Sequence, residues 1–155
     1  MARYRRITIE WSYPVEISSI LQKDCMNDIG IYYISRKFGN NESMLYIGKT
    51  TDKFFNRLES HSIYKIDKYR GEKYVRLGRI VSPKNISEED LKDLINDAEK
   101  TIIFYVSNLC DFELIDNVDC RYRISFNNKL KITNTGYRGK LPKELFIPED
   151  MLYDD

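Results

Sequence analysis

The run Gly30-Ile31-Tyr32-Tyr33-Ile34-Ser35-Arg36-Lys37-Phe38 decides the fold that this sequence predicts. Its aromatic and β-branched residues are typical of a β-strand. Four turn-forming residues follow at 39–42, and Met44–Ile47 again has the composition of a strand. The two strands predict an antiparallel hairpin, and the chain leaves it through Gly48-Lys49-Thr50-Thr51-Asp52.

Further elements are expected on both sides of this hairpin. Strands are expected at Arg3–Glu10, Lys73–Val81, Tyr122–Phe126 and Leu130–Ile132, and helices at Ile17–Met26, about Lys53–Tyr64 and Glu88–Ser107. The last helix is the clearest element, because its apolar residues recur at helical spacing. We expect one α+β domain over residues 1–155: a small, mainly antiparallel three-stranded sheet flanked by helices, with N- and C-terminal decorations.

Composition limits the class of protein. The chain has 155 residues, of which 42% are hydrophobic, so it resembles an ordinary globular domain and neither a disordered nor a collagen-like chain. No apolar run approaches the roughly 20 residues of a membrane span, so we expect no membrane partner. The three cysteines, Cys25, Cys110 and Cys120, form no CxxC pair. They indicate reduced thiols in a cytoplasm and argue against a zinc ribbon.

Charge is segregated along the chain, although the net charge is only +1. Residues 49–79 hold nine basic and four acidic residues, residues 121–143 hold seven basic residues and no acid, and residues 88–119 hold ten acids against two lysines. Such segregation favours a positive surface for a phosphate backbone, although chance clustering on solvated faces is the ordinary alternative. The candidate DNA-contact residues are Arg3, Arg5, Arg6, Lys53, Arg121, Arg123, Lys129, Lys131, Asn134, Arg138 and Lys140.

The two hairpin strands carry Gly30-Ile31-Tyr32 and Tyr46-Ile47-Gly48, which resemble the paired signature of the GIY-YIG nucleases. Four more residues match at the expected distances: Lys49, Arg57, His61 and Glu99. The resemblance covers a nuclease core of about residues 29–110. Residues 1–28 are then an N-terminal extension, and residues from about 111 to 147 a basic DNA-contact region. Residues 134–142 are similar to a segment of restriction-type members.

The spacing of these residues places them independently of the family. Tyr32 and Tyr46 lie on neighbouring strands, where their side chains can share one face. Arg57 and His61 are four residues apart and share one face of their expected helix. Glu99 lies at the edge of the buried helical stripe, closer to the core than its neighbours. The ordinary alternatives are packing for the tyrosines and solvated positions for the charged residues.

The resemblance implies a role for each residue. Glu99 binds one divalent ion per active site, Mg²⁺ or Mn²⁺, and Arg57 stabilises charge on the scissile phosphate. Tyr32 orients or deprotonates the attacking water, with help from Tyr46, Lys49 and His61. The family also has an asparagine after the glutamate-bearing helix. Asn108 is the first match and Asn117 the second.

The resulting expectation is a metal-dependent endonuclease that hydrolyses phosphodiester bonds in double-stranded DNA, a sequence-specific type II restriction enzyme. A histidine four residues after the arginine is similar to the restriction-endonuclease-like branch. A homodimer is expected, because a palindromic site matches two-fold symmetry. The alternatives are a structure-selective, repair or mobile-element GIY-YIG nuclease, a non-catalytic DNA-binding module of the same fold, and an unrelated α+β domain.

Overall fold

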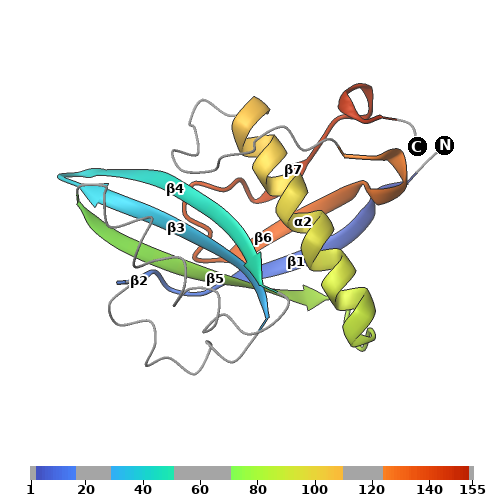
Figure 1. The fold of residues 1–155 in the computed structure, drawn as a ribbon, viewed down its shortest axis with the longest axis horizontal. Coiled ribbons are helices and arrows are strands. Elements are labelled where there is room, and N and C mark those ends of the chain that lie inside the picture. Colours follow the sequence, from blue (N-terminus) through green and yellow to red (C-terminus); the bar gives the residue numbers. More distant parts are fainter. Residues whose placement is uncertain (1–2, 17–28, 51–70, 110–123, 154–155) are drawn as a thin grey trace.

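The structure, a computed structural model, describes residues 3–16, 29–50, 71–109 and 124–153. Strands hold 49% of these residues, and one α-helix lies among them. The expectation of a small three-stranded antiparallel sheet flanked by helices is therefore wrong. The structure has a curled, mixed sheet of seven strands, with a helix across one of its faces (Figure 1).

The elements follow one another in the order strand, strand, hairpin, strand, helix and two strands. They are β1 (Arg5–Trp11), β2 (Val15–Glu16), β3 (Gly30–Phe38), β4 (Asn41–Thr50), β5 (Glu72–Ser82), α2 (Glu88–Leu109) and, after a 3-10 turn at Phe126–Asn128, β6 (Leu130–Gly136) and β7 (Glu144–Phe146), with a last 3-10 turn at Glu149–Met151. The predicted hairpin, the strand after it and the long helix are confirmed.

One predicted strand is wrong, and two predicted helices cannot be compared with the structure. Of the strand expected at Tyr122–Phe126, the described part is not a strand, because Ser125 forms an isolated bridge with Tyr153 and Phe126 begins a 3-10 turn. The helices expected at Ile17–Met26 and about Lys53–Tyr64 lie outside the described residues.

The sheet has the strand order β4-β3-β5-β1-β6-β7, and β2 also pairs with β5. β3 lies antiparallel between β4 and β5, which gives the three-stranded unit that the sequence predicts. β1 then pairs antiparallel with β5 and parallel with β6, so the supposed decorations at both ends of the chain are internal parts of the same sheet. A local residue pattern predicts a strand but carries no information on its distant partner.

The hydrophobic core lies between α2 and one face of this sheet. Leu94, Ile95, Ala98, Ile102, Ile103 and Val106 of α2 belong to one buried cluster with residues of β1, β3, β4, β6 and β7. The helix begins where Ser87 Oγ accepts a hydrogen bond from the Asp90 backbone N–H at 3.1 Å, which satisfies one N-terminal donor. Three acidic residues in the first turn, Glu88, Glu89 and Asp90, interact favourably with the helix dipole.

Asn134 of β6 links two parts of the chain, β1 and the segment that follows β6. The Trp11 indole N–H donates to Asn134 Oδ1 at 2.9 Å, and Asn134 Nδ2 donates to the Pro142 carbonyl at 2.9 Å. Trp11 and Asn134 are almost fully buried. A Cβ atom on Gly78 would lie 2.7 Å from the Trp11 ring, so only glycine lets β5 pass beneath the indole. This side-chain network holds the C-terminal strands on the sheet.

We predict that Asn134→Ala destabilises the protein by about 2–4 kcal/mol, because it leaves the Trp11 N–H and the Pro142 carbonyl buried without their bonds. The free energy of unfolding in urea measures this effect. Asn128→Ala is the control. It removes an exposed bond to Asp97 and is expected to cost under about 1 kcal/mol. Equal effects of the two variants would contradict the proposed importance of the Trp11–Asn134–Pro142 network.

Candidate functional site

Tyr32 and Tyr46 stack on one another across the hairpin. Their ring centroids are 5.8 Å apart, with an interplanar angle of 20°. The neighbouring residues Ile31, Tyr33 and Ile47 belong to the core beneath α2. Because strand side chains alternate, the two tyrosines project from the other face of the sheet. We call the side covered by α2 the helix face and the opposite side the tyrosine face.

Gly48 is the residue of β4 that pairs directly with Tyr32. A Cβ atom at this position would lie 2.3 Å from both Cζ and Oη of Tyr32, and 2.7 Å from Cε1 of Tyr46. No side chain fits there while both rings keep their places. The glycine of Tyr46-Ile47-Gly48 therefore has a direct packing role, which is to let the Tyr32 ring lie flat across β4.

Lys49 projects from the helix face, where its Nζ donates a hydrogen bond to Asn96 Oδ1 of α2. Glu99 lies three residues after Asn96, which is about one turn along the same helix. The structure thus brings Lys49 to the helix that carries Glu99, while the tyrosine pair lies on the opposite side of the same hairpin. β4 is an edge strand, and its two faces carry the two groups.

Glu99 differs from its neighbours Asp97 and Lys100 in its burial. It is 8% exposed and is a buried residue of the helix, whereas Asp97 and Lys100 are only half-buried. The prediction that Glu99 lies closer to the core than these neighbours is confirmed. Burial raises the pKa of the Asp97 carboxyl, and the bond donated by Asn128 opposes this shift.

Other candidate residues lie away from the hairpin or outside the described residues. Asn108 is exposed near the end of α2, where its Nδ2 donates to the Phe104 carbonyl at 3.0 Å. The remaining candidates fall in segments that the structure does not describe: Lys53, Arg57, His61, Asn117, Arg121 and Arg123.

The candidate DNA-contact residues divide into exposed and engaged groups. Arg3, Arg5, Arg6 and Lys140 are exposed. Four others make contacts within the chain: Asn134 to Trp11, Lys129 to Glu149 at 3.0 Å, Lys131 to Glu144 at 3.0 Å, and Arg138 to the Leu141 carbonyl at 3.2 Å. Lys129 and Asn134 are also 3% and 1% exposed, so in this structure they are not presented to a ligand.

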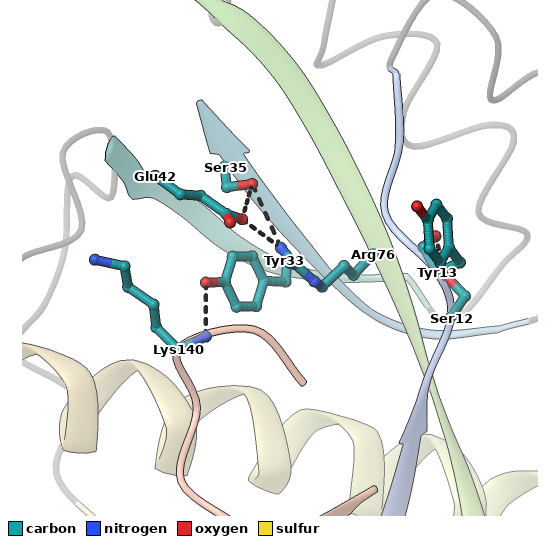
Figure 2. Close-up of polar contacts among 7 residues, drawn as sticks. All are labelled: Ser12, Tyr13, Tyr33, Ser35, Glu42, Arg76 and Lys140. Carbon is teal, nitrogen blue, oxygen red and sulfur yellow. Dashed lines mark hydrogen bonds and ion pairs between the residues drawn. The ribbon is translucent and has the colours of Figure 1, made fainter. Parts of the chain in front are cut away.

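Tyr33, next to Tyr32 in the chain, belongs to a buried polar cluster on the helix face (Figure 2). Arg76 Nη1 lies 2.7 Å from Glu42 Oε1, and the guanidinium carbon is 4.9 Å from the centre of the Tyr33 ring. Ser35 Oγ donates to the same Glu42 oxygen at 2.8 Å. Sequence reasoning missed this ion pair, because nothing local distinguishes Arg76 and Glu42 from other charged strand residues.

The C-terminal run 134–142 docks on this cluster. The Lys140 backbone N–H donates to the Tyr33 hydroxyl at 3.3 Å, as Figure 2 shows. A Cβ atom on Gly139 would lie 3.0 Å from both Arg76 Cζ and the Tyr33 hydroxyl oxygen, and Gly139 has a φ of +59°. Glycine thus suits this position for close packing and for its backbone conformation. Residues 139 and 140 thus pack directly against Tyr33 and Arg76.

Two pKa shifts follow from this cluster. Burial raises the pKa of the Tyr33 hydroxyl to about 12, so this tyrosine stays protonated and is unsuited to act as a base. Burial alone would raise the pKa of the Glu42 carboxyl, but the hydrogen bonds from Arg76 and Ser35 outweigh it and hold that pKa below its ordinary value. Of the two adjacent tyrosines, Tyr33 therefore has a structural role and Tyr32 remains the candidate for chemistry.

Comparisons with family models, curated proteins and solved structures find no match to this chain. Within the described residues, no helix combines the length and the apolar character needed to cross a membrane.

We predict that Gly48→Ala destabilises the protein by about 1–3 kcal/mol, because the new methyl group forces the Tyr32 ring out of its place. Tyr32→Leu removes the ring atoms that the methyl group would meet. In that background the glycine substitution should cost much less, when both are measured by urea unfolding. Tyr32→Leu alone is the reference for the double variant. If Gly48→Ala costs the same in both backgrounds, the ring contact is not the cause.

We also predict that Glu42 stabilises the protein in a pH-dependent manner. Its folded pKa is lowered, so its contribution is present above the ordinary pKa of a glutamate and is lost as the pH falls through the folded value. Glu42→Gln should lower the free energy of unfolding by about 1–3 kcal/mol at neutral pH, and by progressively less in acid. Glu10→Gln, which breaks an exposed pair with Arg79, should show little effect at either pH. A difference between wild type and Glu42→Gln that does not change with pH would contradict this prediction.

Proposed function

We propose that this protein is a metal-dependent endonuclease that hydrolyses double-stranded DNA, with sequence-specific restriction as its function. The observation that carries the proposal is the stacking of Tyr32 on Tyr46 across Gly48. Three residues of the paired signature thus contribute to one compact arrangement. Ordinary strand packing does not require a glycine directly opposite a tyrosine, with a second tyrosine two residues before that glycine.

The chemistry assigned to these residues needs an oriented water, charge neutralisation at the phosphate and assistance to the leaving oxygen. Tyr32 is the candidate to orient or accept a proton from water. An unperturbed tyrosine hydroxyl is a weak acid with a pKa of about 10, so nearby groups must assist this step. Lys49 is bonded to Asn96, so its ammonium is held at the edge strand beside the helix that carries Glu99. Arg57 and His61 complete this proposal from the residues that the structure does not describe.

The donor set suits one hard divalent ion. Among the described residues, no group of three or more histidine, cysteine, aspartate or glutamate side chains is arranged to hold a metal ion. Glu99 offers a single carboxylate, which matches an ion such as Mg²⁺ that keeps most of its ligands as water and phosphate oxygens. When bound, such an ion would supply charge neutralisation at the leaving oxygen.

DNA contact is assigned to exposed cations outside the hairpin. Arg3, Arg5 and Arg6 lie before and at the start of β1, and Lys140 lies in the docked C-terminal run. These side chains reach solvent, whereas Lys129 and Asn134 are buried. The proposal includes a homodimer, for two-fold symmetric sites, and a cytoplasmic location, for which the three cysteines without a CxxC pair remain the support.

The complete burial of Tyr32 favours a second candidate, a DNA-binding module of the same architecture that does not cleave. In that case the tyrosine pair only packs the tyrosine face. The two candidates differ in whether Tyr32 and Glu99 variants change the fate of the DNA without changing the fold.

We predict that the protein cuts a plasmid of known sequence in the presence of Mg²⁺ and leaves discrete ends at one short motif, as end mapping will show. Glu99→Gln and Tyr32→Phe should lower the cleavage rate by about 100-fold or more. The controls are Glu89→Gln, in the exposed first turn of α2, and Tyr137→Phe, an exposed tyrosine. Both should cut like wild type.

Thermal unfolding of each variant separates an effect on chemistry from an effect on structure. Wild-type protein that binds the plasmid and leaves it intact would establish the second candidate. Random ends would refute sequence-specific restriction.

A further inference from the structure

The turn end of the β3–β4 hairpin distributes its charges between two faces. Arg36 of β3 pairs directly with Lys73 of β5, and strand alternation puts both on the tyrosine face. Lys37 pairs with Glu42 and with Glu72, and these three side chains lie on the helix face. The register therefore brings two cations side by side on the same face as Tyr32.

Arg36 and Lys73 are both half-buried on this face. An anion held beside the two side chains would interact favourably with both. Their juxtaposition is thus a favourable feature for a phosphate.

A hollow lies beside Arg36 at the same end of the hairpin. Its volume is about 420 Å³, and its walls include Arg36, Phe38, Asn41 and Ser43. The register pairs Arg36 with Ser43 and Phe38 with Asn41, so all four belong to the tyrosine face. Phe38 is 60% exposed, which presents an aromatic surface next to a guanidinium, a hydroxyl and an amide. This mixture suits a nucleotide, whose phosphate needs charge and whose sugar or base needs an apolar contact.

The hollow lies on the same face of β3 as Tyr32, which is itself fully buried. Tyr32 and Arg36 are four residues apart on β3 and share a face. At roughly 3.3 Å per residue they are about 13 Å apart along the strand. That length corresponds to about four base-pair steps of duplex DNA, at about 3.4 Å each. Figure 1 shows this end of β3, β4 and β5 at the left, extending away from α2.

We propose that Arg36, Lys73 and Phe38 form a nucleotide subsite, which holds a backbone phosphate of duplex DNA a few nucleotides from the bond presented to Tyr32. Arg36 and Lys73 bind the phosphate, and the Phe38 ring contacts the adjoining sugar or base. The subsite rests on the proposed function for its distance from the cut, but its phosphate recognition is measurable without cleavage.

The test measures binding of a short fluorescent duplex by anisotropy, at several salt concentrations and without a divalent ion. Arg36→Gln/Lys73→Gln should weaken binding about tenfold or more at low salt. It should also make the dependence of log K on log salt shallower by about 1 for each phosphate that the variant no longer neutralises. Phe38→Ala should weaken binding and leave that slope unchanged.

The matched control is Lys37→Gln/Lys84→Gln, which removes the same amount of charge from the helix face of β3 and from the exposed loop before α2. It should change affinity and slope much less. Urea unfolding of both double variants verifies that each is folded under the binding conditions. Weaker binding by the folded subsite variant then reflects the missing cations.

The outcomes separate the subsite from the nuclease. If both double variants bind alike with equal salt slopes, the subsite is refuted, whether or not the plasmid is cut. If the salt slope falls only for Arg36→Gln/Lys73→Gln, the subsite stands even when wild type leaves the plasmid intact. Wild-type protein that does not bind the duplex at low salt would refute the subsite.

Discussion

The hydrogen-bonded register of β3 between β4 and β5 is the constraint on which the rest of the structure depends. It places Tyr32 opposite Gly48 on one side and opposite Leu77 on the other. A slip of one residue would move Tyr32 to the helix face, and would move Ile31 and Tyr33, which now pack beneath α2, to the tyrosine face. The burial of two different sets of side chains therefore specifies one register, and that register assembles the tyrosine pair.

Local patterns in the sequence predicted β3, its neighbour β5 and the helix α2. The bounds of β3, the strand β5 and the long helix α2 all follow from composition and periodicity over a few residues. The larger sheet could not be predicted in this way, because β1 finds its parallel partner β6 at the other end of the chain. The side chains that enforce this pairing, Trp11 and Asn134, look unrelated in the sequence and meet only in the folded core.

The candidate site shows the same division. The stacking of Tyr32 on Tyr46 and the burial of Glu99 agree with what spacing and helical periodicity indicate. The cluster of Tyr33, Arg76 and Glu42 could not be predicted in this way, because its members come from three different strands. Gly139 and Lys140, from the C-terminal part of the chain, pack against it. The sequence places Asn96 one helical turn before Glu99, on the same side of α2. Its contact with Lys49 could not be predicted, because it depends on how α2 lies across β4.

The parallel pairing of β1 with β6 also has a consequence for how the chain folds. β1 is synthesised before the other described strands, yet it lies in the interior of the sheet between β5 and β6. The β3–β4 hairpin joins neighbouring residues, so its loop closes at little entropic cost, whereas β1 and β6 close a loop that includes most of the chain. Trp11 therefore stays without its Asn134 partner until ribosomes have added the C-terminal strands. Closure of this sheet therefore follows synthesis of β6, and its non-local contacts make it slower than formation of the hairpin.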